Sequence, residues 1–195
     1  MLIYPMNALA TDQSKRLANL IWHNPKLKNN VTAGLFVGES ERDPKVAMGE
    51  NHLITDKNLL RQNPPDILLT NYKMLDYLLL RPRDQQIWSN NAARTLRYLG
   101  VDEIHTFDGA QGTDLACLIR RLKARLNIPE RYLVCVGTSA TLGGTEGRED
   151  MLTYAKSLFN EPFDESAIIS EDRLSSAEFL ADAFIKKIGF KTPSF

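Results

Sequence analysis

Two adjacent carboxylates, Asp102 and Glu103, and the nearby His105 are the residues of this sequence best suited to chemistry. They directly follow the run from Leu96 to Val101, which is typical of a buried strand. An acid pair at the end of a parallel strand can hold Mg²⁺ through one carboxylate while the other orients or deprotonates a water, as ATP hydrolysis requires. Taken alone, such a pair is more often a solvated turn or a helix cap.

The elements that must position this pair predict an α/β fold. Short apolar runs alternate with segments of helical periodicity, which indicates a mostly parallel sheet flanked by helices. We expect strands at 2–4, 31–37, 66–71, 96–101 and 131–136. We expect helices in a segment ending near 22 and at 56–62, 72–80, 113–126, 151–159 and 176–188, with a loop or short helix at 83–93 held to the core by Trp88.

Ligands of parallel sheets collect at the carboxyl ends of the strands. The small or polar residues that follow the expected strands are Asn7, Gly38, Thr70 with Asn71, Asp102 with Glu103, and Thr138 with Ser139. The sequence therefore predicts that all five strand ends contribute to one rim.

The composition is that of an ordinary globular protein. The 195 residues include 24 basic and 24 acidic side chains. The chain therefore lacks the overall positive charge that is typical of many nucleic-acid-binding proteins. The basic face of the expected helix 113–126 is interpreted as a surface exposed to solvent and not as a binding surface.

Cys117 and Cys135 have apolar neighbours and no metal-binding spacing, which favours buried, reduced thiols in a cytoplasmic protein. No apolar run is long enough to span a membrane, and the first residues lack the pattern of a signal peptide.

Four short motifs, in order along the chain, resemble those of superfamily-two DEAD/DEAH-box helicases. Asp102-Glu103-Ile104-His105 is similar to the DEAH-type box (motif II), and Ser139-Ala140-Thr141 is similar to the SAT motif (motif III). Pro5-Met-Asn-Ala-Leu-Ala10 resembles motif Ia, and Leu69-Thr70-Asn71 resembles motif Ib. Phe107 to Gly112, followed by Arg120-Arg121-Leu122, further resembles large bacterial helicases related to RecQ-like DNA-repair enzymes.

This resemblance implies a first RecA-like domain of a P-loop NTPase over residues 1–160, with 161–195 as a connector toward a second such domain. It implies ATP and Mg²⁺ as cofactors and nucleic acid as partner, with DNA favoured over RNA. The implied catalytic residues are Asp102, which would also be the Mg²⁺ ligand, Glu103, His105, Ser139 and Thr141. The implied contacts to the nucleic-acid backbone are Asn7, Ala8, Thr70 and Asn71.

The sequence departs from the family pattern in one respect. A helicase of this type holds ATP phosphates with a Gly-rich loop ending in Gly-Lys-Ser/Thr, and no such loop occurs here. We therefore expect an incomplete RecA-like domain that neither binds ATP tightly nor hydrolyses it alone: a truncated chain, a fragmentary gene product or one part of a split protein. The run from Tyr132 to Val136 would then lie at an exposed edge of the sheet or pair with something else, which is an aggregation hazard for an apolar strand.

Two other functions remain open. One is a non-catalytic module, derived from a helicase domain, that binds nucleic acid or a protein through the same rim. The other is a small metal-dependent hydrolase with Asp102, Glu103 and His105 as ligands.

Overall fold

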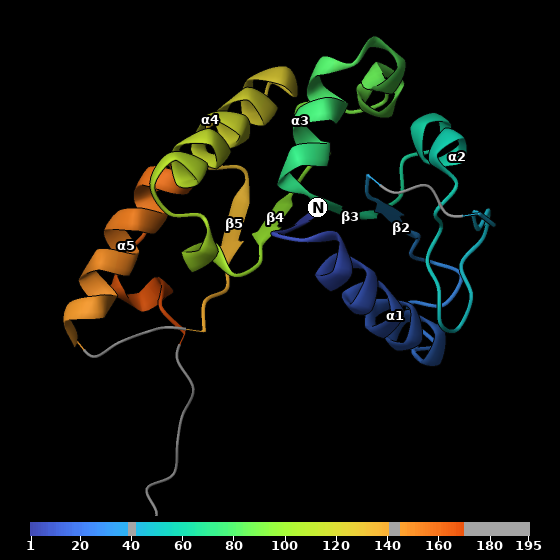
Figure 1. Ribbon diagram of the computed structural model, residues 1–195, viewed down its shortest axis with the longest axis horizontal. Coiled ribbons are helices and arrows are strands. Elements are labelled where there is room, and N and C mark those ends of the chain that lie inside the picture. The colour runs from blue at the N-terminus through green and yellow to red at the C-terminus, as the bar shows by residue number, and fades with distance from the viewer. Residues whose placement is uncertain (39–41, 141–144, 170–195) are drawn as a thin grey trace, which may run out of the picture.

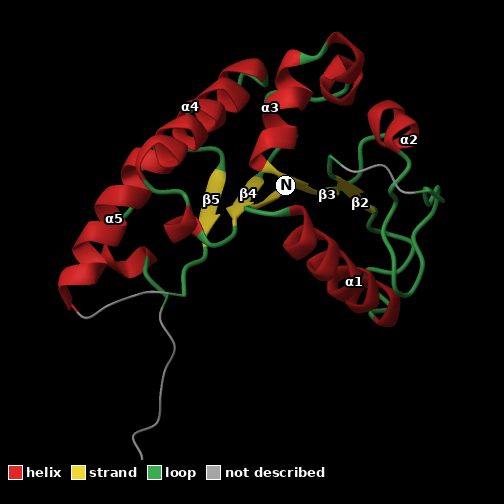
Figure 2. Cartoon of the chain, viewed as in Figure 1, coloured by secondary structure: helices red, strands yellow, loops and turns green. Residues whose placement is uncertain are grey.

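Five parallel strands form one sheet in the computed structural model, which describes residues 1–38, 42–140 and 145–169. In spatial order the sheet runs β2-β3-β1-β4-β5. The strands are β1 (Leu2–Tyr4), β2 (Ala33–Phe36), β3 (Ile67–Asn71), β4 (Tyr98–Val101) and β5 (Val134–Gly137). The predicted α/β class and parallel sheet are confirmed (Figure 2).

The helices cover the two faces of the sheet unequally (Figure 1). Helix α1 (Asn7–His23) packs on one face, and α2 (Lys57–Gln62), α3 (Tyr72–Leu80), α4 (Gly109–Arg125) and α5 (Thr145–Phe159) pack on the other. Three short 3₁₀ helices complete the described part: η1 (Pro82–Trp88), η2 (Ile104–Thr106) and η3 (Glu165–Ala167). Trp88 is buried and donates from Nε1 to the Leu78 carbonyl at 2.8 Å, so it does hold its segment to the core.

Two apolar clusters hold these layers together because successive strand residues point to opposite faces. Ile3 and Leu68 belong to the cluster beneath α3 and α4, whereas their neighbours Tyr4 and Leu69 belong to the cluster beneath α1. Both faces of the central strands are therefore buried, which explains why these strands read as continuous apolar runs.

Strand β5 lies at an open edge of the sheet, as the sequence predicted. On the face that carries α1, Tyr98 of β4 is 62 % exposed and its neighbour in register, Val134, is 37 % exposed. Val136, two residues along β5, is 51 % exposed on the same face. At the opposite edge, Ile54 exchanges backbone hydrogen bonds with Ala33 and Leu35 and so covers part of β2.

Element boundaries differ from expectation mainly at helix starts. Helix α4 begins at Gly109, four residues before the predicted 113, and directly follows the extended backbone of Asp108. Helix α5 begins at Thr145 and not at 151. Asp56 caps α2 as expected, accepting from the Leu59 N–H at 2.7 Å. The predicted helix 176–188 lies outside the described residues.

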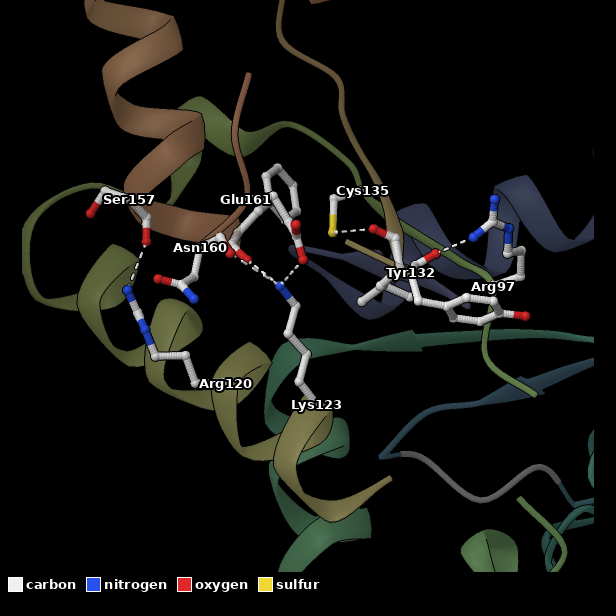
Figure 3. Close-up of polar contacts among 10 residues, drawn as sticks. Arg97, Arg120, Lys123, Tyr132, Cys135, Ser157, Asn160 and Glu161 are labelled. Carbon is white, nitrogen blue, oxygen red and sulfur yellow. Dashed lines mark hydrogen bonds and ion pairs between the residues drawn. The ribbon is translucent and has the colours of Figure 1, made fainter. Parts of the chain in front are cut away.

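One interpretation from the sequence is wrong and another is incomplete. The basic side chains of α4 are largely exposed, as expected, but they also connect α4 to neighbouring elements (Figure 3). Lys123 lies 2.6 Å from both the Phe159 carbonyl and a Glu161 carboxylate oxygen, and Arg120 donates to the Ser157 carbonyl. These contacts satisfy carbonyls at the carboxyl end of α5. The wrong interpretation concerns Cys117, which was expected to be buried and is exposed, whereas Cys135 is buried as expected.

Candidate functional site

The carboxyl ends of β4 and β5 are joined through Thr138. Its hydroxyl donates to Asp102 Oδ1 and accepts from the backbone N–H of Glu103 at 3.0 Å. Glu103 adopts the left-handed conformation, with φ 51° and ψ 52°, which is uncommon for a residue with a side chain. Thr138 therefore holds both acids of the predicted pair, and the strained backbone at Glu103 is supported by the neighbouring strand.

His105 reaches the residue that follows Thr138. Its Nδ1 lies 3.1 Å from Ser139 Oγ and 3.2 Å from Glu103 Oε2. That carboxylate oxygen is buried and has no well-aligned hydrogen bond among the described residues. The structure thus brings Asp102, Glu103, His105 and Ser139 together, while the predicted Thr141 lies outside the described residues.

The segment after the box is fixed against α5. Tyr154 of α5 donates its hydroxyl to the Phe107 carbonyl, and the Phe107 ring meets Tyr72 edge-on at 5.4 Å between ring centroids. A Cβ at Gly112 would approach the Phe107 carbonyl oxygen to 2.5 Å, so this position excludes any larger residue. The aromatic and glycine residues after the acid pair therefore anchor the 3₁₀ turn that carries His105.

A surface hollow of about 240 Å³ opens beside Asp102 on the side of the sheet that carries α1. Its lining includes Tyr4, Gln13, Asp102 and Thr138. Burial, and secondarily the charge of Asp102, raises the pKa of Tyr4. Tyr4 therefore stays a neutral hydroxyl beside the carboxylate.

The predicted nucleic-acid contacts lie at the ends of β1 and β3. Asn71 caps α3, accepting from the Met74 N–H at 2.7 Å, and its amide donates to the side chain of Asn7. Asn7 is the first residue of α1 and not its cap, and Ala8 beside it is exposed. Thr70 is fully buried and donates to the Phe36 carbonyl at 2.7 Å, so its hydroxyl is engaged within the fold.

The N-terminus of α1 carries no side-chain cap from its cap residue, Met6, and the first turn holds no acid. The first N–H groups of a helix have no partner within the helix and carry its positive dipole end. This terminus, next to the Asn7 and Asn71 pair, is therefore suited to an anion.

Two features of the site go beyond the sequence prediction. The sequence places Thr138 only on the rim, although a hydroxyl directly after a strand is a usable signal for a residue that joins two strand ends. The second feature is a set of four cationic side chains that line a pocket beneath α3, which the sequence does not mark as a group: Lys57, Arg61, Arg81 and Arg83. They come from two stretches of the chain, 57–61 and 81–83, so no single local pattern groups all four.

No group of three His, Cys, Asp or Glu side chains positioned to hold a metal occurs in the described ranges. Among the helices of these same ranges, none has the length and apolar character needed to cross a membrane.

Comparison with known proteins agrees with this geometry. The chain is 35 % identical over 124 residues to the Druantia protein DruE of Escherichia coli, covering 60 % of this chain and 7 % of DruE. It is 25 % identical over 163 residues to the ATP-dependent helicase hrq1 of Schizosaccharomyces pombe, covering 80 % of this chain and 13 % of hrq1. The chain thus spans a small part of these curated relatives.

Solved structures of helicases share the fold. The DUF1998 helicase MrfA bound to DNA and AMPPNP matches with a TM-score of 0.58 and 22 % identity, over 84 % of this chain and 19 % of that chain. The Mycobacterium smegmatis helicase Lhr, bound to ssDNA and AMP-PNP, matches with a TM-score of 0.56 and 21 % identity, over 80 % of this chain and 18 % of that chain. The family model of the DEAD/DEAH box helicases matches residues 1–149, and the chain belongs to this family.

Proposed function

We propose that this chain is part of an ATP-dependent helicase or translocase that acts on nucleic acid, with DNA as the favoured track. The observation that carries the proposal is the arrangement of Asp102, Glu103 and His105 at the end of β4, joined by Thr138 and Ser139 to the end of β5. The fold of MrfA and Lhr, whose structures contain DNA and a nucleotide analogue, supports the same function.

The residues at the strand ends fit the acidic half of an ATPase site. Carboxylate and hydroxyl oxygens are the ligands that Mg²⁺ prefers, and Asp102 with Thr138 supplies both. Bound ATP and Mg²⁺ would supply the phosphoryl group and its charge neutralisation. Glu103 would then orient or deprotonate the attacking water through the buried oxygen that lacks a well-aligned hydrogen bond.

His105, Ser139 and Thr141 would link this site to the strand that follows. The contacts of His105 Nδ1 with Glu103 and Ser139 support the role of His105 and Ser139, because His105 then connects the acid pair to the residues after β5. Thr141 is assigned by motif alone.

The backbone of the nucleic acid would cross the N-termini of α1 and α3. Asn7, Ala8 and Asn71 lie there, and N–H groups and amide side chains at a helix start can contact phosphates without reading bases. Thr70 would act by fixing this end of β3 to the Phe36 carbonyl.

The other half of the ATPase site would come from elsewhere. The sequence holds no phosphate loop, so we propose that a further segment or a partner subunit packs on the open edge of β5 and supplies it. The uncovered face formed by Tyr98, Val134 and Val136 supports this docking place. In this view residues 1–160 form the partial RecA-like domain, and 161–195 lead toward a second one.

The test measures binding of a labelled oligonucleotide by this chain, with and without ATP analogue, over a range of salt. Salt-dependent binding that Asn7→Asp weakens is expected, because a carboxylate there repels phosphate. Recovery of DNA-stimulated ATPase after fusing a phosphate-loop segment upstream would support the motor function. Binding that never responds to nucleotide in that fusion would favour the non-catalytic binding module, which the lack of a phosphate loop also suggests.

A further inference from the structure

A pocket of about 340 Å³ opens between α2, α3 and η1, away from the acid pair. Among the residues that the structure describes, four cationic side chains line it, namely Lys57, Arg61, Arg81 and Arg83, together with one carboxylate, that of Asp84. The described part of the lining therefore carries more positive than negative side chains.

The carboxylate of Asp84 is already committed to one of these cations. Asp84 is 1 % exposed, and its Oδ1 accepts from Arg61 Nε at 2.6 Å. Its second oxygen has no hydrogen-bond donor in the part of the chain that the structure describes. Asp84 thus orients Arg61 and offsets its charge, and Lys57 donates to the Gly38 carbonyl at 3.3 Å. Arg81 and Arg83 add further positive charge to the described lining.

The electrostatics of Lys57 report this excess. Burial lowers the pKa of Lys57, and the positive charges of Arg61, Arg83 and Arg81 lower it further, against a smaller opposing effect of Asp84. The cations are therefore close enough to repel one another, and a bound anion would relieve that repulsion.

The shape of the pocket also suits a polymer backbone. Tyr77 is 40 % exposed, and the guanidinium of Arg81 lies on its ring, 3.6 Å from the centroid. An exposed aromatic ring beside cations is the pattern of sites that bind single strands, where bases stack while phosphates are neutralised.

The pocket is continuous with the rim. Gly38, which follows β2, lines the pocket. A Cβ atom built at Gly38 would lie 3.9 Å from Asn7 Nδ2, so Gly38 is also close to Asn7. The pocket therefore starts beside the Asn7 and Asn71 pair, so a strand crossing the helix N-termini would reach it next.

We propose that the pocket lined by Lys57, Arg61, Arg81 and Arg83 binds a backbone phosphate of single-stranded nucleic acid, next to the one at Asn7. This assignment rests on the proposed function, since it extends the same nucleic-acid path along α3.

The experiment measures the affinity of the 195-residue chain for a labelled oligo-dT by fluorescence anisotropy at several salt concentrations. The variant Arg81→Gln with Arg83→Gln should bind several-fold more weakly at low salt. The slope of log K against log salt should become shallower by about 0.7 for each phosphate that the variant no longer neutralises. Arg83→Gln alone should show a smaller change of the same kind. Because Arg83 is exposed, this single variant should fold normally, so its result holds even if the double variant misfolds.

The matched control is Arg16→Gln with Lys26→Gln, which removes the same charge from exposed positions on α1 and the turn after it. It should leave the slope at the wild-type value. Equal slopes for the pocket variant and the control, while Asn7→Asp still weakens binding, overturn the pocket and leave the proposed function standing. Absence of any salt-dependent binding by the wild-type chain overturns both.

A second arm separates nucleic acid from free anion. Inorganic phosphate at millimolar concentration should raise the melting temperature of the wild-type chain less than oligo-dT does. Stabilisation by phosphate that the pocket variant abolishes, with unchanged affinity for oligo-dT, would show that the pocket takes a free anion and would overturn the assignment.

Discussion

The hydroxyl of Thr138 donates to the carboxylate of Asp102 across two neighbouring strand ends, between residues 36 positions apart in the chain. The same oxygen accepts from the Glu103 N–H, so a single side chain fixes both acids. The acid pair is therefore a product of the β4 and β5 pairing and not of its own strand alone.

Thr138→Ala should destabilise the chain by about 1–2 kcal/mol, because it removes two hydrogen bonds and Glu103 keeps its left-handed backbone without support. Urea unfolding followed by circular dichroism measures this. Thr138→Ser retains the hydroxyl and should restore most of the stability. A serine variant as unstable as the alanine variant would mean that packing of the methyl group, and not the hydrogen bonds, is what matters.

The isolated chain should show no ATP hydrolysis above background, because its sequence contains no loop ending in Gly-Lys-Ser/Thr to hold the phosphates. A coupled assay of phosphate release, with and without single-stranded DNA, tests this. Glu103→Gln serves as the control for contaminating ATPases. Activity of the wild type that this substitution abolishes would refute the prediction.

The two thiols should differ sharply in reactivity. Cys117 is exposed, whereas burial raises the pKa of the Cys135 thiol to about 11. At pH 8 a disulfide reagent should label one thiol per native chain rapidly and the second only after unfolding. Cys117→Ser should then react slowly in the native state and at once in denaturant, and rapid labelling of that native variant would contradict the burial of Cys135.

The same thiol makes stability depend on pH. The pKa of Cys135 is higher in the folded chain than the value of about 8.5 expected in the unfolded chain. Below about pH 8.5 the thiol is neutral in both states, so it does not make stability depend on pH there. As the pH rises from about 8.5 toward 11, ionisation of the thiol in the unfolded chain should reduce the stability of the native state. Urea midpoints of the wild type and of Cys135→Ala, compared at pH 7 and pH 10, should differ in their pH dependence in this sense.

Removal of the Lys123 ammonium should be costly. Lys123→Met leaves the Phe159 carbonyl and the Glu161 carboxylate without their shared donor, and the side chains of Lys123 and Glu161 are only 15 % and 14 % exposed. We expect a loss of about 2–3 kcal/mol in unfolding free energy. Arg121→Gln breaks the exposed pair with Asp76 and should cost less than about 1 kcal/mol. Equal losses for the two variants would contradict the structural role of Lys123.

Hydrogen exchange should reveal the open edge of β5 residue by residue. The N–H groups of Val134 and Thr138 are bonded to the Arg97 and Val101 carbonyls of the β4 side. Because donors alternate in direction along a strand, the N–H groups of Cys135 and Gly137 point toward the open edge. In the monomer these two should exchange much faster than Val134 and Thr138. Uniform protection along β5 would show that another segment or copy covers the edge.

The class of fold, the order of the elements and the identity of the acid pair all follow from the amino-acid sequence. Continuous apolar runs and helical periodicity are local properties, and they place β1, β3 and α3 within a residue of their observed bounds. Asp102 and Glu103 can be found because their chemistry and their place after a strand are visible in adjacent residues.

Which side chains lie next to one another depends on how the elements pack. Packing pairs Asp102 with Thr138 and His105 with Ser139, and it makes the basic side chains of α4 contact α5. It also gathers four cationic side chains around one pocket: Lys57, Arg61, Arg81 and Arg83. These relationships join residues from separate elements through packing and burial, so no local pattern in the sequence specifies them.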